Sequence, residues 1–444
     1  MSLDTHRKTG NPGVWSDIGR VPSHPGGGIF TIAGRAFCVS GRSGNIAELG
    51  PQGFFNNDTR FLSGFHLLVN GVDPEVVDAT SIDADEAVFF LRSRADEQDE
   101  HAEPGLVVRR HRYQGPTLHE DIIIDNRSGQ AATLTVELQV CVDFADVFDV
   151  RRAGPATERS VGARYSDGEL VFSYRADTFE RATRISTTGD AQRDGNRLVL
   201  SRRVEANQRW KTCVDVVPVI DGSPMPIERS CTAGHHAHAA PTAPRQIAHP
   251  PRLRSSADAL EHLWAHSLGD LAALEITMNG QRVFAAGIPW FVALFGRDSV
   301  ITSMEAMLLD REAALGTAQL LAELQGTKTD PSVSEEPGKI IHELRFGERS
   351  LPYDLMSRYY GAVDTTPLWC MLLDKLHRWG ADRARLHSLL PNLRAAVAWI
   401  LQALETGDGF LTYRGDVTRL DNQGWKDSGD SMVDGTGRHI DPPI

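Results

Sequence analysis

Hydrophobic positions follow a two-residue period in the first half of the chain. Five runs are rich in Val, Ile, Thr and aromatic residues, which predicts strands. They are residues 106–113, 118–126, 133–144, 169–174 and 209–220. In the third run, alternate apolar residues share one face, and turn-forming stretches without a helical pattern separate the runs. The pattern predicts an antiparallel β-sandwich over residues 29–220.

After residue 252 the period becomes helical. Apolar stripes of helical spacing run through residues 260–274, 300–308, 368–376 and 389–404. Ser255 or Ser256 is the expected N-cap of the first helix, and Asp364 precedes the third. No strand pattern of similar strength intervenes, so residues 253–444 are expected to form an all-helical domain.

Two segments lie outside these patterns. Residues 1–28 are rich in Gly and Pro and predict a flexible lead-in, and residues 221–252 form a Pro-, Ala- and His-rich linker. His235, His236 and His238 offer metal ligands, but no acidic or cysteine partner accompanies them, which favours a solvated linker.

Composition narrows the function classes. The chain of 444 residues has 41% hydrophobic and 24% charged residues, typical of globular proteins, and a net charge of −13. That charge argues against nucleic acid or an anionic membrane as partner, whereas a neutral sugar is unaffected. With neither an apolar leader nor a membrane span, a cytoplasmic location is expected.

Cysteine usage gives no sign of a disulfide framework or a metal site. The five cysteines are widely spaced, and no two form a CxxC pair. Buried reduced thiols are the expected state. They are Cys38, Cys141, Cys213, Cys231 and Cys370.

The segment GIPWFVALFGRDS (287–299) places two aromatic residues and an Arg-Asp pair before a helix. Arg297 and Asp298 together offer donors and acceptors for vicinal sugar hydroxyls. Trp290 or Phe291 offers an apolar face to a pyranose ring. The alternative, that Asp298 caps the helix while Arg297 pairs with a neighbour, is equally open.

Two further segments concentrate carboxylates. EEPGKIIHELRFGE (335–348) lacks the HExxH zinc motif, because Phe346 stands where the second His is needed, and a solvated loop is the alternative. LDNQGWKDSGDS (420–431) places Asp427 near Trp425, and an indole beside a buried carboxyl raises its pKa as a general acid requires. A calcium loop lacks the expected Glu, and a simple Asx-turn loop remains open.

Taken together, these motifs resemble a known family. GFFNNDTRFL (53–62) and LVNG (68–71) resemble the N-terminal sandwich domain of bacterial glycogen-debranching-enzyme-like proteins. The three segments above, with PYDLMSRYYGAVDTTPLW (352–369) and GDGFLTYR (407–414), resemble their amylo-α-1,6-glucosidase domain. The resemblance covers about residues 30–220 and 255–441.

The resemblance implies an (α/α)6 barrel that hydrolyses glucosidic bonds of α-glucans with inversion and without a cofactor. Asp427 matches the family's general acid. Matching substrate-binding positions are Trp290, Phe291, Arg297, Asp298, His342, Glu343, Asp364 and Trp425. About six helices are expected, half of such a barrel, and its unpaired apolar faces would favour association.

The general base is not expected in this chain, because the family carries it in the later half of the barrel; nothing in the spacing favours Glu343 or Glu348 instead. Two alternatives stay open. One is a non-catalytic glucan-binding protein, and the other is a glucoamylase- or trehalase-like hydrolase on the same barrel.

Overall fold

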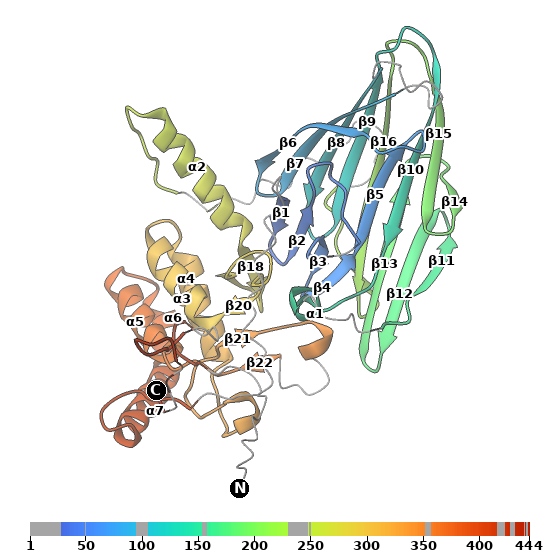
Figure 1. Ribbon diagram of the computed structural model, residues 1–444. Coiled ribbons are helices and arrows are strands. Elements are labelled where there is room, and N and C mark those ends of the chain that lie inside the picture. The colour runs from blue at the N-terminus through green and yellow to red at the C-terminus, as the bar shows by residue number, and fades with distance from the viewer. Residues whose placement is uncertain are drawn as a thin grey trace.

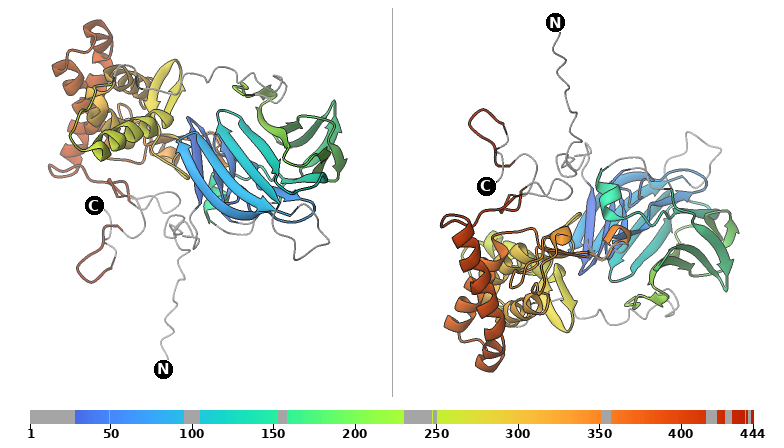
Figure 2. Two further views of the ribbon diagram at one scale, coloured as in Figure 1. Left: turned by 90° about the horizontal axis from the view of Figure 1, so that it is seen from above. Right: turned by 90° about the horizontal axis from the view of Figure 1, so that it is seen from below.

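The computed structural model describes residues 28–48, 50–94, 105–152, 158–229, 247, 250–350, 357–414, 422–426, 431–438, 440 and 443–444. A β-rich part, blue to green in Figure 1, stands beside a helical part, yellow to red. The views in Figure 2 show that the two parts meet along one side of each.

The largest sheet of the β part has nine strands, in the order β11-β12-β13-β16-β9-β8-β7-β6 with β17 on β16. Its strand pairs are antiparallel. The strands are β6 Glu75–Asp83, β7 Glu86–Ser93, β8 Leu106–Gln114, β9 Leu118–Asn126, β11 Gly162–Ser166, β12 Glu169–Ala176, β13 Phe179–Thr187, β16 Arg209–Ile220 and β17 Ser223–Pro224.

A second antiparallel sheet packs its apolar face against the first. Its strands, in spatial order, are β14 Gln192–Asp194, β15 Arg197–Val204, β10 Ala132–Cys141 and β5 Gly64–Val69. Alternate β10 residues from Leu134 to Val140 are fully buried, in one core cluster with Ile122 and Val214 of the larger sheet. The antiparallel β-sandwich predicted from the alternation is therefore confirmed, and the five predicted runs lie on β8, β9, β10, β12 and β16.

A four-stranded sheet lies on the side of the β part that contacts the helical part. It consists of β1 Ile29–Ala33, β2 Ala36–Ser40, β3 Gly53–Asn56 and β4 Thr59–Leu62. Asn57 and Asp58 form the two-residue turn between β3 and β4, both in the left-handed region with φ of 46° and 61°. Asn and Asp tolerate this conformation better than other non-glycine residues. The short helix α1, Val147–Arg152, was not predicted and lies beside this turn.

The helical part contains six of the seven α-helices that the described residues form. They are α2 Asp258–Ala273, α3 Gly296–Glu305, α4 Arg311–Glu323, α5 Thr365–Arg378, α6 Arg383–Ser388 and α7 Leu390–Thr406. The four predicted stripes lie on α2, on α3 with the 3₁₀ turn Ala306–Leu308, on α5 and on α7. Six helices do not establish a barrel of six helical hairpins.

The all-helical expectation is wrong in one respect, because five short strands lie between the helices. They are β18 Glu275–Met278, β19 Gln281–Phe284, β20 Leu294–Phe295, β21 Glu343–Leu344 and β22 Arg358–Tyr359. These strands have two or four residues each, too short for a period-2 pattern to stand out in the sequence.

Helix α2 differs from the prediction in its N-cap and in the exposure of its apolar stripe. Its N-cap is Ala257, with no side-chain cap, whereas Ser255 accepts a hydrogen bond from the Ala257 amide. Figure 1 shows its first turns extending beyond the other helices. Leu260 and Leu263 of its apolar stripe are 50% and 63% exposed.

Among the described residues, no helix is both long and apolar enough to cross a membrane.

The histidines at 235, 236 and 238 and Cys231 lie outside the described residues. The other four cysteines are free thiols: Cys38 and Cys213 are buried, and Cys141 and Cys370 are partly buried.

Candidate functional site

A three-stranded sheet joins two of the motifs. β20 pairs with β21 and β21 with β22, so that Phe295 lies opposite Glu343 and Glu343 opposite Tyr359. The Gly296 amide continues the pairing by donating to the His342 carbonyl at 2.7 Å. The Arg-Asp segment and the His-Glu segment are therefore neighbours in space.

Gly296 is required at the start of α3 because of its surroundings. A Cβ atom there would lie 2.2 Å from the Ile341 carbonyl oxygen and 2.6 Å from Cγ2 of Thr365. Both distances are below van der Waals contact, and the first neighbour is backbone. A side chain at this position would separate α3 from the segment that carries His342 and Glu343.

Arg297 connects three motifs that are far apart in the sequence. Its side chain is buried, and Nη1 donates to Oδ2 of Asp364 and to the Gly424 carbonyl, each at 2.8 Å. The Val363 amide also donates to the Gln423 carbonyl at 2.9 Å. Residues 296–298, the N-terminus of α5 and the segment 422–426 thus form one cluster.

Asp298 lies half-buried in the first turn of α3. Burial raises the pKa of its carboxyl, the charge of Arg297 opposes this rise, and the charge of Asp364 adds to it. The N-cap of α3 is Phe295, which makes no side-chain cap. Asp298 is therefore not the N-cap, although its negative charge is favourable in the first turn.

His342 is fully enclosed at the centre of this cluster. Burial lowers the pKa of its imidazole to about 3, and the charges of Arg297, Arg345 and Lys339 lower it further. The rings of Phe295 and Tyr359 meet it edge-on, with centroids 5.7 and 5.8 Å away. His342 is consequently neutral near pH 7, so it acts as a dipole and not as a cation.

Glu343 is bound to the buried Arg345. Arg345 Nε donates to Oε2 of Glu343 at 3.1 Å, Nη1 to Oδ1 of Asp58 at 2.9 Å, and Nη2 to the Trp290 carbonyl at 3.1 Å. The guanidinium also lies over the rings of Phe148 and Phe295. Glu343, which the sequence predicts as a site residue, is thus held by a cation that also joins the two parts of the chain.

The predicted aromatic residues have different exposures. Trp290 is 8% exposed and packs in a core cluster with Phe55 and Phe148 of the β part, whereas Trp425 is 77% exposed. Phe291 is partly buried, edge-on to Phe295. Asp427 lies outside the described residues, two positions beyond Trp425.

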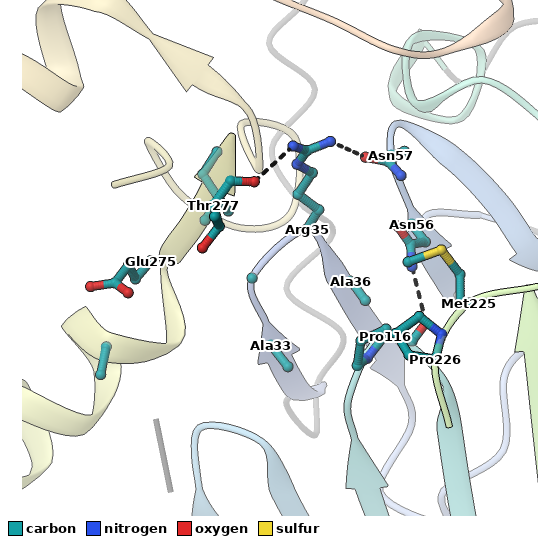
Figure 3. A pocket seen from close by; sticks show the side chains of 13 residues that line it. Ala33, Arg35, Ala36, Asn56, Asn57, Pro116, Met225, Pro226, Glu275 and Thr277 are labelled. Carbon is teal, nitrogen blue, oxygen red and sulfur yellow. Dashed lines mark hydrogen bonds between the residues drawn. The ribbon is translucent and has the colours of Figure 1, made fainter. Parts of the chain in front are cut away.

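A pocket of about 580 Å³ at the junction of the two parts was not predicted (Figure 3). Arg35, in the turn between β1 and β2, donates to Oδ1 of Asn57 at 2.9 Å and to the Thr277 carbonyl at 3.2 Å. Asn56 donates to the Pro116 carbonyl at 3.0 Å, and Glu275 lies on the helical side. The sequence signal that could have indicated this pocket is the polar Asn56-Asn57 pair at the tip of the β3–β4 hairpin.

A second pocket, of about 440 Å³, lies between α5, α6 and α7 and was also not predicted. It is mostly apolar, lined by Leu373, Leu386 and Leu393 among others, with His377 and His387 at its wall. None of the predicted site residues lines either pocket.

Among solved structures, a protein described as a kojibiose phosphorylase from the human microbiome resembles the chain with 8% identity and a TM-score of 0.45. That match covers 79% of this chain, which spans only 60% of the phosphorylase. An aldose 1-epimerase-like protein of Escherichia coli K12 matches 44% of this chain over 100% of its own length, with 9% identity and a TM-score of 0.28. At these TM-scores the likenesses carry no argument about function.

No curated protein matches the chain. The model of a family described as the N-terminal domain of some glycogen debranching enzymes matches residues 32–215, which span the last two residues of β1, strands β2 to β15 and most of β16. Over residues 32–215 the chain is therefore similar to the N-terminal domains of some glycogen debranching enzymes.

Proposed function

We propose that the chain is a glycoside hydrolase of the debranching type, which cuts α-1,6-glucosidic bonds of α-glucans with inversion. The observation that carries the proposal is the double contact of Arg297 with Asp364 and with the Gly424 carbonyl. It brings the segment that precedes Asp427 beside the Arg-Asp pair. The family match of residues 32–215 supports the substrate class.

In this proposal Arg297 and Asp298 bind the hydroxyls of the terminal glucose, and the exposed indole of Trp425 stacks on a sugar ring. Asp427 donates a proton to the glycosidic oxygen while water attacks the anomeric carbon from the opposite face. Water then needs a second carboxylate as base, at about 6.5–9.5 Å from the acid. No cofactor takes part in this chemistry.

The proposal assigns the base to neither of two nearby glutamates. Glu343 is bound to Arg345. Glu348 is bound to Arg159 and accepts from the Tyr174 hydroxyl. Both carboxylates are held by partners that also contact the β part, which supports a structural role for each.

We also propose the larger architecture that the resemblance implies. Residues 29–220 and 253–444 would be separate domains, joined by the linker 221–252, and the helices α2 to α7 would belong to a barrel of helical hairpins. The exposed Leu260 and Leu263 of α2 support association through an apolar face. A hydrodynamic measurement of this chain checks that association.

A non-catalytic glucan-binding protein is the second candidate. It would keep Arg297, Asp298 and the aromatic residues but lack a base, and the candidate bases Glu343 and Glu348 are both bound by arginines. Binding without glucose release would select this candidate. A glucoamylase- or trehalase-like hydrolase would instead release glucose from linear maltooligosaccharides or trehalose.

The sugar subsite is tested by isothermal titration with maltose and with panose, on the wild type and on Arg297→Lys. A lysine cannot hold Asp364 and Gly424 in the fixed geometry of a guanidinium, so affinity should fall at least about 10-fold. The matched control is Arg282→Lys, which alters an ion pair with Glu275 and Asp310 and should leave the affinity unchanged. Equal affinities in all three proteins would refute the subsite.

A further inference from the structure

Strands β9 and β16 place four ligand-type side chains on one face of the large sheet. His119 and Asp121 are two residues apart on β9, and Cys213 and Asp215 are two residues apart on β16, so each pair shares a face. In the antiparallel register His119 lies opposite Asp215, and Asp121 lies opposite Cys213. The four Cα atoms form a compact rectangle.

The side-chain atoms of this group converge and are buried. One ligand atom each from His119, Asp121 and Cys213 lies within 4.8 Å of the other two. These residues are 7%, 5% and 6% exposed. Nε2 of His119 is 3.3 Å from Oδ1 of Asp121, and Nδ1 is 2.6 Å from Oδ1 of Asp215.

These distances fit two ligands and one supporting residue of a tetrahedral metal site. Zn–N and Zn–O bonds of about 2.0–2.1 Å at tetrahedral angles set the nitrogen and oxygen about 3.3 Å apart. Asp215 lies where a carboxylate commonly orients a metal-bound histidine, by accepting a hydrogen bond from its other ring nitrogen. We propose that His119, Asp121 and Cys213 bind a divalent zinc-class cation, with Asp215 as the residue that orients His119.

The charges of the group suit this ion. A thiolate, a carboxylate and a neutral imidazole around Zn²⁺ give a first shell with no net charge. Lys211, whose Nζ is 2.9 Å from Oδ2 of Asp121, adds a positive charge to the group, which offsets the negative charge of Asp215 in the total. Nitrogen, oxygen and sulfur donors together favour zinc over calcium or magnesium, which prefer oxygen alone.

A proton is the competing occupant of the same position. Nε2 of His119 and the Cys213 thiol bind a metal only when they are deprotonated, so the affinity would weaken as the pH falls.

The test uses the full chain, stripped with a chelator and then titrated with Co²⁺ or Zn²⁺. Wild type should bind about one ion per chain and show the charge-transfer absorption of a Co²⁺–thiolate bond. Cys213→Ser should lose that absorption, and Asp215→Asn should bind about 10–100-fold more weakly. The control Cys141→Ser, on the neighbouring sheet, should behave as wild type.

Wild type alone suffices to refute the proposal. If it shows no Co²⁺–thiolate absorption and retains no stoichiometric zinc, the four side chains form an ion-paired network only. Absorption that persists in Cys213→Ser and disappears in Cys141→Ser would place the metal elsewhere and would equally overturn the assignment. Neither result bears on the proposed glycosidase site, whose residues lie in the helical part.

Discussion

Replacement of Asp58 by Asn tests whether the β3–β4 turn holds the two parts of the chain together. Asp58 is 6% exposed, and its carboxylate accepts from Nη1 of Arg345 and from the Phe346 amide, both at 2.9 Å. The change keeps the shape of the side chain and suits the left-handed φ of 61°. It removes the charge and replaces one acceptor oxygen by an NH2 donor, which then faces either Arg345 or the Phe346 amide.

The magnitude follows from two opposing effects. A hydrogen bond to a charged group contributes about 1.5–3 kcal/mol, and the bond between residue 58 and Arg345 keeps only one of its two charged partners in the variant. Arg345 keeps Glu343 as an anionic partner, so no buried cation is left without one. Loss of the repulsion between Asp58 and Asp146 offsets part of the cost. We expect a net loss of about 2 kcal/mol in the free energy of unfolding.

The assay is denaturant unfolding followed by tryptophan fluorescence, since seven of the eight tryptophans follow residue 200. Asp167→Asn is the matched control, because Asp167 also has a left-handed φ, of 54°, but lies exposed in the β11–β12 turn. It should change the unfolding free energy by less than about 0.5 kcal/mol. Equal small effects of the two substitutions would show that the Asp58 contact does not stabilise the chain.

Two further predictions concern the same region. Burial raises the pKa of Asp146 to about 7, so the contribution of its carboxyl to stability is complete below pH 3.8 and is lost as the pH rises through 7. The unfolding free energy of wild type relative to Asp146→Asn should therefore shrink by up to about 4 kcal/mol between pH 4 and pH 8. A difference independent of pH would contradict this. Gly296→Ala forces a Cβ against the Ile341 carbonyl and should lower the unfolding midpoint sharply. The control Gly129→Ala, where the added Cβ meets no atom, should not lower it. Equal midpoints of the two variants would show that α3 tolerates a side chain at position 296.

The sequence predicts where helices and strands lie along the chain better than which other elements they contact. Strands β9 and β16 begin and end where the hydrophobic runs do, because alternation and turn residues are local signals. Their pairing joins residues 96 positions apart, and alternation specifies a face but not a partner strand. Helix α2 was predicted from its stripe, yet Leu260 and Leu263 are exposed, because periodicity does not say what covers a face.

The candidate site shows the same limit. The motifs pointed to Arg297 and Asp364, but only the fold shows that they share a hydrogen bond and that Gly424 joins them. The sequence did not predict that Arg345 joins the two parts of the chain, because a lone arginine in a charged segment is usually solvated. The cluster around His119 was missed because its ligands pair across two strands and match no linear spacing.

The central claim, that the helical part carries a glucan-cleaving site with Asp427 as its acid, is tested most directly by glucose release from a limit dextrin. We predict that the rate of glucose release falls at least about 100-fold in Asp427→Asn and is retained in the exposed control Asp374→Asn. Equal rates for wild type and Asp427→Asn would contradict the claim.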